Sequence, residues 1–161
     1  MITKEQLAEG YALNLRLIQM QTEGMSHAES LTQTPYNINC LNWVLGHIAV
    51  GRDSVLRLVG EEPLLSETET GRYRTESDPI TGEADDIIPL ERLLEILTVG
   101  QERINVGFAR LTEVELTREI SVGDRQVQLG TRLHGFYFHD TYHTGQTDLL
   151  RQISGANDKV I

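Results

Sequence analysis

Apolar residues recur at helical intervals over four long segments of the chain, and polar stretches separate these segments. In the first segment the apolar positions are Leu7, Tyr11, Leu15 and Ile18. Three- and four-residue steps place such side chains on one face of an α-helix. Thr3 and Gln6 have the spacing of a capping box at the start of this helix. The first predicted helix therefore begins at Thr3 and ends near Gly24.

The second segment predicts another amphipathic helix after a polar stretch. Asn37 or Asn39 is placed to cap it. The helix is expected from about Cys40 to Val59, and Gly60 suits its end. The apolar stripe of this helix is Leu41, Val44, Leu45, Ile48, Val55 and Val59.

The third segment follows a long stretch in which the helical pattern disappears. Between Glu61 and Asp86 the chain is rich in Gly, Pro, Ser, Thr and acidic residues, so we expect a loop, and a lid is one interpretation of it. Pro89 suits the first position of a helix that continues to about Thr112, and Asp85 and Asp86 lie near its positive end. The apolar positions of this helix are Leu90, Leu93, Leu94, Leu97, Ile104, Phe108 and Leu111.

The last segment combines a short extended region with a fourth helix. The run EISVGDRQVQL, residues 119–129, alternates around a Gly-Asp pair and predicts a small hairpin or an extended excursion. Thr131 is expected to cap a helix that continues to about Ile153 and ends at Ser154 and Gly155. Four long helices without a large sheet predict an all-α fold, a four-helix bundle.

Composition restricts the number of domains and the expected location of the protein. A chain of 161 residues with 39% hydrophobic and 24% charged residues is expected to form one globular domain over residues 1–161. No stretch is apolar for the roughly 18 residues that a membrane span requires. The start, MITKEQLAEG, lacks the basic and apolar regions of a secretory signal. We therefore expect a cytoplasmic protein without a membrane partner.

Charge and cysteine content narrow the possible partners and metal ligands. The formal net charge is −10, from 24 acidic and 14 basic residues, and such a surface repels nucleic acid. Arg72 and Arg74 flank Tyr73, which could stack on a base, but acidic residues surround them, and a solvated loop is the preferred interpretation. Cys40 is the only cysteine, which excludes an internal disulfide and thiolate zinc cages. A metal ion would need His, Asp or Glu ligands.

Two of the five histidines are spaced to meet at one point. His139 and His143 are four residues apart on the fourth predicted helix, on the side that also carries Phe136, Gln146 and Leu150. A buried imidazole needs partners for both nitrogens, because an unpaired buried polar group costs on the order of 1–3 kcal/mol. Carboxylates and carbonyls could satisfy each ring separately, or one cation could satisfy both.

A third histidine, His47, lies at the edge of the apolar stripe of the second predicted helix. Three neutral imidazoles match the ligand set of a catalytic metal site with an open position for water or substrate. Zinc or nickel suits this set best, and iron or manganese is possible. Asp140 and Gln146 are candidates for hydrogen bonds to the ligand rings. His27 and His134 fall elsewhere and are not expected to bind metal.

The sequences around these histidines resemble a known family. NCLNWVLGHIAV, followed by FHDTYHTGQTDLL some ninety residues later, is similar to the DinB-like (DinB/YfiT) metalloprotein superfamily, which has one histidine in its second helix and an H-x-x-x-H-x-G-Q signature in its fourth. The resemblance covers the whole chain. It implies that His47, His139 and His143 are the metal ligands, in a bundle with up-down-down-up connections that is often a homodimer.

The resemblance implies several functions. The superfamily includes transferases and isomerases that use a low-molecular-weight thiol, and uncharacterised stress-induced members. Transfer of such a thiol to a small electrophile is the function we favour, with Arg52, Arg57 and Arg132 as candidate contacts to a charged thiol. The alternatives are a metal-dependent hydrolase, a non-catalytic metal-binding protein, and a bundle that has lost its metal. Cys40 is expected to be a small buried residue rather than a nucleophile.

Overall fold

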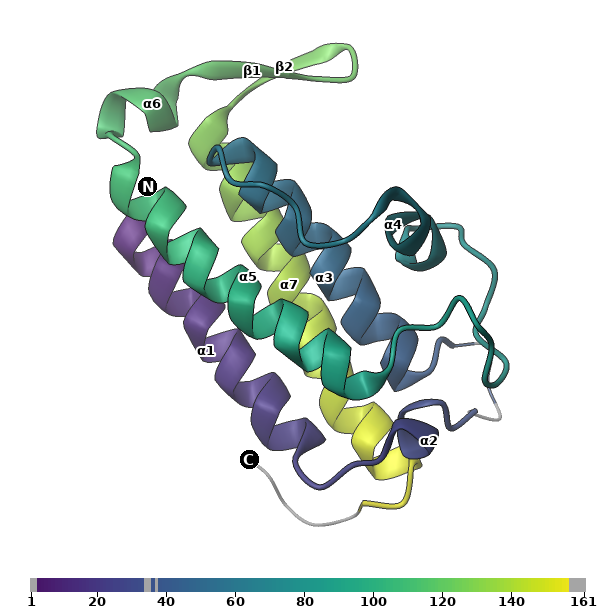
Figure 1. The fold of residues 1–161 in the computed structure, drawn as a ribbon. Helices are drawn as coiled ribbons and strands as arrows, with labels where there is room; N and C mark the ends of the chain where they lie inside the picture. The colour runs from purple at the N-terminus through teal and green to yellow at the C-terminus, as the bar shows by residue number, and fades with distance from the viewer. Residues whose placement is uncertain (1–2, 34–35, 37, 157–161) are drawn as a thin grey trace.

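The computed structural model describes residues 3–33, 36 and 38–156, and within them the chain is mostly helical (Figure 1). The described residues form seven helices and one two-stranded sheet. The helices are α1 (Lys4–Thr22), α2 (His27–Ser30), α3 (Leu41–Leu58), α4 (Glu67–Tyr73), α5 (Leu90–Arg110), α6 (Glu113–Thr117) and α7 (Leu129–Ile153). The strands are β1 (Glu119–Val122) and β2 (Arg125–Gln128). The predicted all-α class is therefore confirmed.

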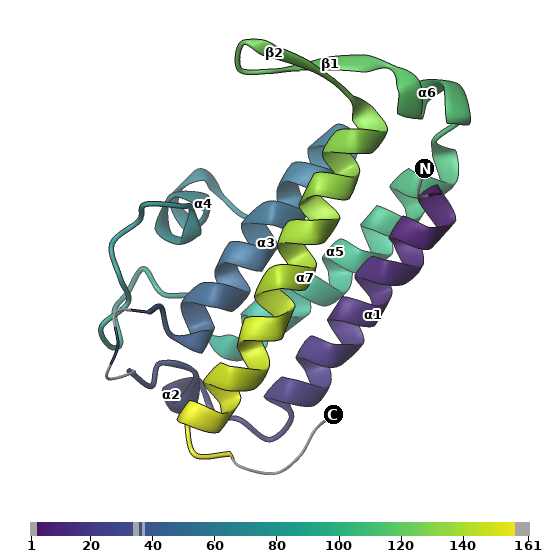
Figure 2. The ribbon, with the colours of Figure 1, turned by 180° about the vertical axis from the view of Figure 1, so that it is seen from behind.

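The four long helices α1, α3, α5 and α7 lie side by side, as Figures 1 and 2 show from opposite directions. α3 packs against both α5 and α7, and α1 packs against the same two helices. Their predicted apolar stripes face inward. The side chains with no measurable exposure include Tyr11, Leu45, Leu93, Leu97, Ile104 and Leu133. Burial of these side chains is the main force that holds the helices together, since each contributes about 1.5–3 kcal/mol.

The predicted starts of α3 and α5 need correction. Cys40 is the N-cap of α3 and makes no side-chain cap hydrogen bond, so Asn39 does not cap this helix, and Asn37 lies outside the described residues. Pro89 is the N-cap of α5 rather than its first helical residue. Cys40 and Pro89 carry no side-chain oxygen that could accept from the first N–H groups of these helices, so neither start has the usual capping signal. Gly60 ends α3 as expected, with φ at 77°.

The last helix starts earlier than Thr131, which lies inside it. α7 begins at Leu129, and Gln128 is its N-cap without a side-chain cap hydrogen bond. The predicted hairpin is present, with Glu119 paired to Gln128, and it runs directly into the helix. The Leu129 N–H donates to the Arg118 carbonyl at 2.9 Å, so the hairpin satisfies a backbone donor that a capping side chain would otherwise satisfy.

Residues 61–86 do not form the plain loop that the sequence suggests. They contain α4, which begins with a capping box between Ser66 and Glu69. The buried Asp53 carboxylate accepts hydrogen bonds from the N–H groups of Leu64 and Leu65, each at 2.9 Å, and ties the start of the segment to α3. The short helices α2 and α6 are also absent from the predicted pattern, because four or five residues are too few to show a helical period.

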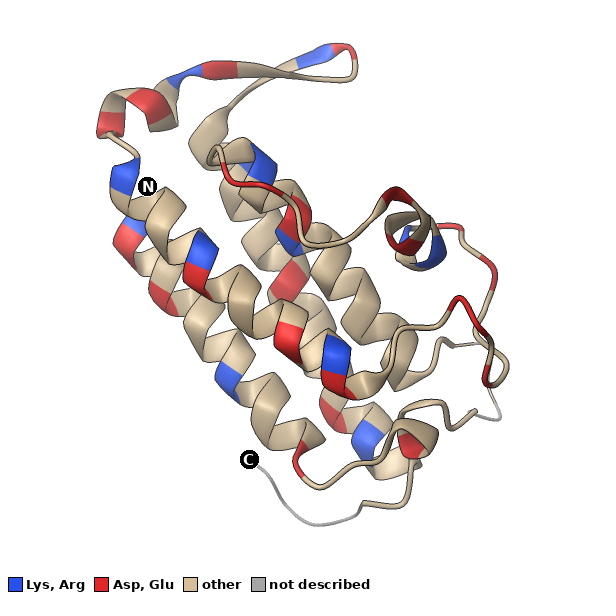
Figure 3. Cartoon of the chain, in the orientation of Figure 1, with Lys and Arg blue, Asp and Glu red and all other residues tan. Residues whose placement is uncertain are grey.

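The surface agrees with the limits that composition set. Lys and Arg residues are scattered among Asp and Glu residues in Figure 3, without a broad basic face in this view. Tyr73 is fully buried, and its hydroxyl donates to Asn42 Oδ1 at 2.9 Å, so it is not able to stack on a nucleic-acid base. Within the described residues, no helix has the length and apolar character that crossing a membrane requires.

Candidate metal centre

α3 and α7 bring together the three histidines that the sequence singled out. His47 is on α3, and His139 and His143 are on adjacent turns of α7. One ring nitrogen of each lies within 4.8 Å of the others, a grouping that could hold a metal ion. The shortest contact joins His47 Nε2 and His139 Nε2 at 2.9 Å. Two ligands of a tetrahedral ion with 2.0–2.1 Å bonds lie about 3.3 Å apart, so the His47 and His139 rings would need to separate by only a few tenths of an ångström.

Hydrogen bonds fix which nitrogen of two rings carries the proton. His47 Nδ1 donates to the Tyr73 carbonyl at 2.8 Å, and His143 Nδ1 donates to Gln146 Oε1 at 2.7 Å. Both partners are acceptors, so the proton is on Nδ1 in each ring and the Nε2 lone pair is free. This is the tautomer that binds a metal through Nε2. The expected role of Gln146 is therefore seen in the structure.

The third ring, His139, has one nitrogen without a hydrogen-bond partner among the residues that the structure describes. Its Nδ1 is buried and, within the described residues, makes no hydrogen bond. Gly51 on α3 leaves room for this edge of the ring, because a Cβ there would lie 3.1 Å from Nδ1. The other nitrogen, Nε2, faces the His47 lone pair, so either a proton or a cation must lie between them. The residues present thus fit a divalent ion held by three imidazoles.

Burial keeps all three imidazoles neutral. It lowers the pKa of His139 from 6.5 to about 4, and the neighbouring His143 and His47 rings add to the effect. Burial also lowers the pKa of His47 and of His143, and the hydrogen bonds to Tyr73 and Gln146 oppose that shift. Neutral rings are the form that binds a metal, so protons compete weakly with an ion at neutral pH.

Aromatic side chains hold two of the rings in place. Trp43 stacks on His47 with centroids 4.7 Å apart and an angle of 13° between the planes. Its Nε1 donates to Ser77 Oγ at 2.9 Å, which fixes the indole. Tyr142 contacts the His143 ring edge-on at 5.1 Å. Packing of this kind keeps the imidazole rings in a fixed mutual geometry.

The histidines open onto two clefts. The larger, of about 770 Å³, is lined by all three histidines and by apolar groups that include Trp43 and Leu150. The smaller, of about 510 Å³, is lined by His47 and His139 but not by His143. A small molecule can therefore approach the histidine cluster, as an open coordination position requires.

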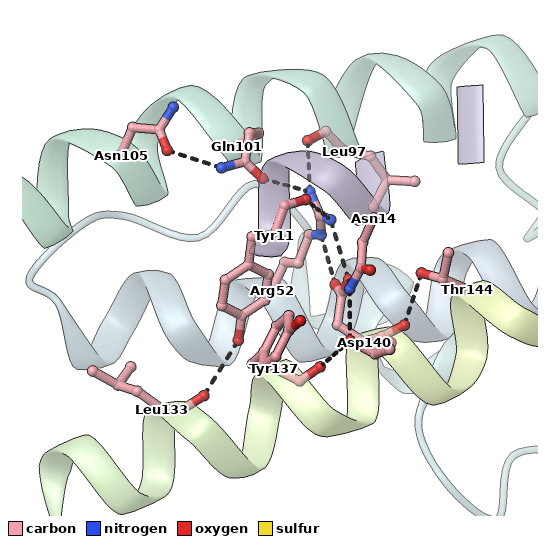
Figure 4. Close-up of polar contacts among 11 residues, drawn as sticks. Tyr11, Asn14, Arg52, Leu97, Gln101, Asn105, Leu133, Tyr137, Asp140 and Thr144 are labelled. Atoms are coloured by element: carbon pink, nitrogen blue, oxygen red, sulfur yellow. Dashed lines mark hydrogen bonds and ion pairs between the residues drawn. The ribbon is translucent and has the colours of Figure 1, made fainter. Parts of the chain in front are cut away.

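Asp140 has a different role from the expected one. Its carboxylate does not support a ligand ring but pairs with Arg52, with 2.8 Å between Arg52 Nε and Asp140 Oδ2, and also accepts from Asn14 Nδ2 at 2.7 Å (Figure 4). Arg52 is only 2% exposed, so it is not available to a charged thiol. Arg57 is exposed and does not line either cleft of the centre. Of the three predicted arginines, only Arg132 lines a cleft beside the histidines.

The remaining histidines and the cysteine lie apart from the cluster. His27 Nδ1 accepts from the Leu90 N–H at 3.1 Å, and its Nε2 is 3.0 Å from a Glu83 carboxylate oxygen. His134 is exposed on α7. Cys40 is 1% exposed, and burial raises the pKa of its thiol, as expected for a small core residue rather than a nucleophile.

Sequence reasoning missed residues that come from the segment 61–86. Tyr73 supplies the carbonyl that orients His47, and Glu76 lines the larger cleft with a φ of 67°. A non-glycine residue at positive φ stores backbone strain, which is concentrated at functional sites in proteins. The segment has no periodic pattern, so the sequence gives no signal that it would reach the histidines.

Comparisons with known proteins establish similarity of fold only. No family model matches the chain, and no curated protein matches it. A crystal structure of a conserved protein from Enterococcus faecalis is similar over 98% of this chain and 99% of that chain, with a TM-score of 0.75 and 16% sequence identity. At this identity the likeness extends to the arrangement of the helices and not to the chemistry of the site.

Proposed function

We propose that the protein binds one divalent metal ion through His47, His139 and His143 and uses it to transfer a low-molecular-weight thiol to a small electrophile. One observation carries the metal site. His47 and His143 each have Nδ1 held by an acceptor, and they are grouped within 4.8 Å with a third ring that has a buried, unpartnered nitrogen. Zinc and nickel are the favoured ions, and iron or manganese would also suit imidazole ligands.

We further propose that the chain is a DinB-like four-helix bundle with up-down-down-up connections. The histidine motifs on α3 and α7 support this proposal. So does the course of the long helices, since α1 and α7 run in one direction and α3 and α5 in the other (Figures 1 and 2). The same resemblance favours a homodimer, which light scattering would measure. A cytoplasmic location suits a chain whose only thiol is the buried Cys40.

An ion held by neutral imidazoles keeps its full positive charge and supplies a Lewis acid that lowers the pKa of a coordinated thiol or water. The chain's own residues supply the rest. Trp43 and Tyr142 hold the ligand rings, and the larger cleft offers apolar walls to an electrophile. His143 is kept in its binding tautomer by Gln146.

Metal-dependent hydrolysis is the second candidate, and Glu76 is the observation in its favour. It is the only acidic residue among the described lining of the larger cleft. A carboxylate beside a metal site can act as a general base toward water. Glu76→Gln would abolish a hydrolase and leave thiol transfer largely intact, so this variant separates the two reactions.

Elemental analysis of protein purified without an affinity tag tests the metal site. We expect about one equivalent of metal, lost in His47→Ala, His139→Ala and His143→Ala. His134→Ala, on the exposed side of the same helix, is the matched control and should keep its metal. Protein that is purified without metal and does not bind added zinc or nickel would overturn the proposal.

A thiol screen tests the reaction. Metal-loaded protein is mixed with cysteine, glutathione, bacillithiol or mycothiol and an electrophile such as monochlorobimane or an epoxide. We expect turnover with at least one thiol, and its loss in His143→Ala but not in His134→Ala. If no thiol reacts while the metal stays bound, the transferase proposal is wrong and the metal site stands.

A further inference from the structure

The smaller cleft beside the histidines has a charge opposite to that of the molecule. Its lining residues are His47, Val50, Gly51, Ser54, Arg74, Thr75, Arg132, Gly135, Phe136 and His139. Two arginines and no acidic residue are among these described residues, although the whole chain carries 24 acidic and 14 basic residues. A concave surface with one sign of charge concentrates ligands of the other sign.

Within the described residues, neither guanidinium group is paired with an acidic side chain. Four others, Arg52, Arg72, Arg92 and Arg110, form ion pairs with Asp or Glu side chains. Within the part of the chain that the structure describes, the guanidinium groups of Arg74 and Arg132 have neither a hydrogen bond nor an ion pair. Their donors are therefore available to a ligand.

Arg132 is also held in position. Its guanidinium carbon lies 4.2 Å from the centre of the Phe136 ring, one helical turn further along α7. Stacking on an aromatic face limits the rotamers of the side chain, so less entropy is lost when it binds an anion. The nearest acidic residue in sequence to Arg74 is Glu76, which lines the larger cleft and not this one.

We propose that Arg74 and Arg132 form a subsite for the carboxylate of a small molecule whose other end reaches the metal. The inference rests on the proposed function, because His47 and His139 line both clefts and join the subsite to the ion. A guanidinium fork matches the two oxygens of a carboxylate. Val50 and Phe136 offer apolar walls to the adjoining carbon chain, which favours an organic acid over a free, fully hydrated phosphate ion.

The first experiment uses metal-free protein, so it does not depend on the proposed reaction. Butyrate is titrated into ¹⁵N-labelled protein at constant ionic strength, with n-butylamine and inorganic phosphate as comparison ligands. We expect saturable amide shifts at Gly135 and Phe136 with butyrate alone. Arg132→Gln should weaken butyrate binding about tenfold, the size of one charge-assisted hydrogen bond.

Matched variants make this result specific. Arg125→Gln, at an exposed position of β2, changes the net charge equally and should leave butyrate binding unchanged. Arg74→Gln, also at an exposed position, should weaken binding without affecting the fold. Equal affinity of butyrate for wild type, Arg74→Gln and Arg132→Gln would overturn the subsite. Stronger binding of phosphate than of butyrate would overturn the choice of carboxylate.

The second experiment joins the subsite to the metal. Cobalt-substituted protein is titrated with 3-mercaptopropionate and with 2-mercaptoethanol, and thiolate binding is measured from the charge-transfer band. We expect the anionic thiol to bind about tenfold more tightly, and Arg132→Gln to remove this preference. Equal affinity for the two thiols would overturn the subsite but not the proposed function. If neither thiol binds while butyrate still binds the metal-free protein, the proposed function fails and the subsite stands.

Discussion

Replacement of Asp140 by Asn should destabilise the protein strongly although it removes no atoms from the core. Asp140 and Arg52 form an ion pair whose side chains are only 3% and 2% exposed. Arg52 Nε lies 2.8 Å from Asp140 Oδ2, and Nη2 lies 3.3 Å from Oδ1. Asp140→Asn leaves the guanidinium buried without a counter-ion. Breaking a buried pair in this way costs about 3–5 kcal/mol, a large share of the 5–15 kcal/mol that stabilises a typical domain.

The other hydrogen bonds of Arg52 place the expected loss of stability at the lower end of this range. Its Nη2 also donates to the Tyr11 carbonyl at 3.2 Å, and Nη1 donates to the Leu97 carbonyl and to Gln101 Oε1, each at 3.3 Å (Figure 4). These neutral acceptors remain in the variant and compensate part of the lost attraction. We therefore expect a decrease of about 3 kcal/mol in the free energy of unfolding.

Guanidinium chloride denaturation of metal-free protein measures this quantity. Asp148→Asn, on the same helix, is the control, since Asn can still accept the hydrogen bond from Gln152, and it should change stability by less than about 0.5 kcal/mol. The double variant Arg52→Met, Asp140→Asn should lose less than the sum of the single variants, because no charge is left unpaired. A loss below about 1 kcal/mol in Asp140→Asn would refute the reasoning.

Three further predictions follow from the site. Burial lowers the pKa of His139 to about 4, so on acidification the unfolded chain takes up this proton before the folded chain does. The free energy of unfolding of metal-free protein should therefore be at its full value above about pH 6.5 and fall by about 3 kcal/mol toward pH 4. Denaturation curves across this range would check the prediction, and a flat profile would contradict it. Gly46→Ala places a Cβ 2.1 Å from the buried Tyr73 ring and should cost about 1–3 kcal/mol, measured by the shift in thermal midpoint. Gln146→Ala should weaken zinc binding about 10- to 100-fold in competition with a chelator, because His143 loses the acceptor that fixes its tautomer; unchanged affinity would exclude this role.

The periodic parts of the sequence predicted the structure well. The start of α1 has the expected capping box between Thr3 and Gln6, and α3 ends at the expected glycine, Gly60. The convergence of His47 with His139 and His143 also followed from the pattern, because each lies on the side of its helix that faces the core. The ends of the helices were predicted less accurately. Thr131 was expected to cap α7, but the helix begins at Leu129, because the Arg118 carbonyl accepts from the Leu129 N–H in place of a local cap.

Non-periodic contacts were not readable from the sequence. Asp140 was expected beside a ligand ring, but Arg52 from α3 reaches it across the core. The Tyr73 carbonyl that orients His47 lies in a segment without any pattern. Such partners depend on where a connection crosses a helix, and residue spacing carries no information about that crossing.

The amino-acid sequence by itself determined the four long helices, the acidic surface and the choice of three histidines, because apolar periodicity and residue type act locally. Only the tertiary structure decided which ring nitrogens carry protons, which aspartate pairs with which arginine, and which two arginines line the smaller cleft beside His47 and His139. These features depend on distances of a few ångströms between residues far apart in the chain, and packing of the whole core sets those distances.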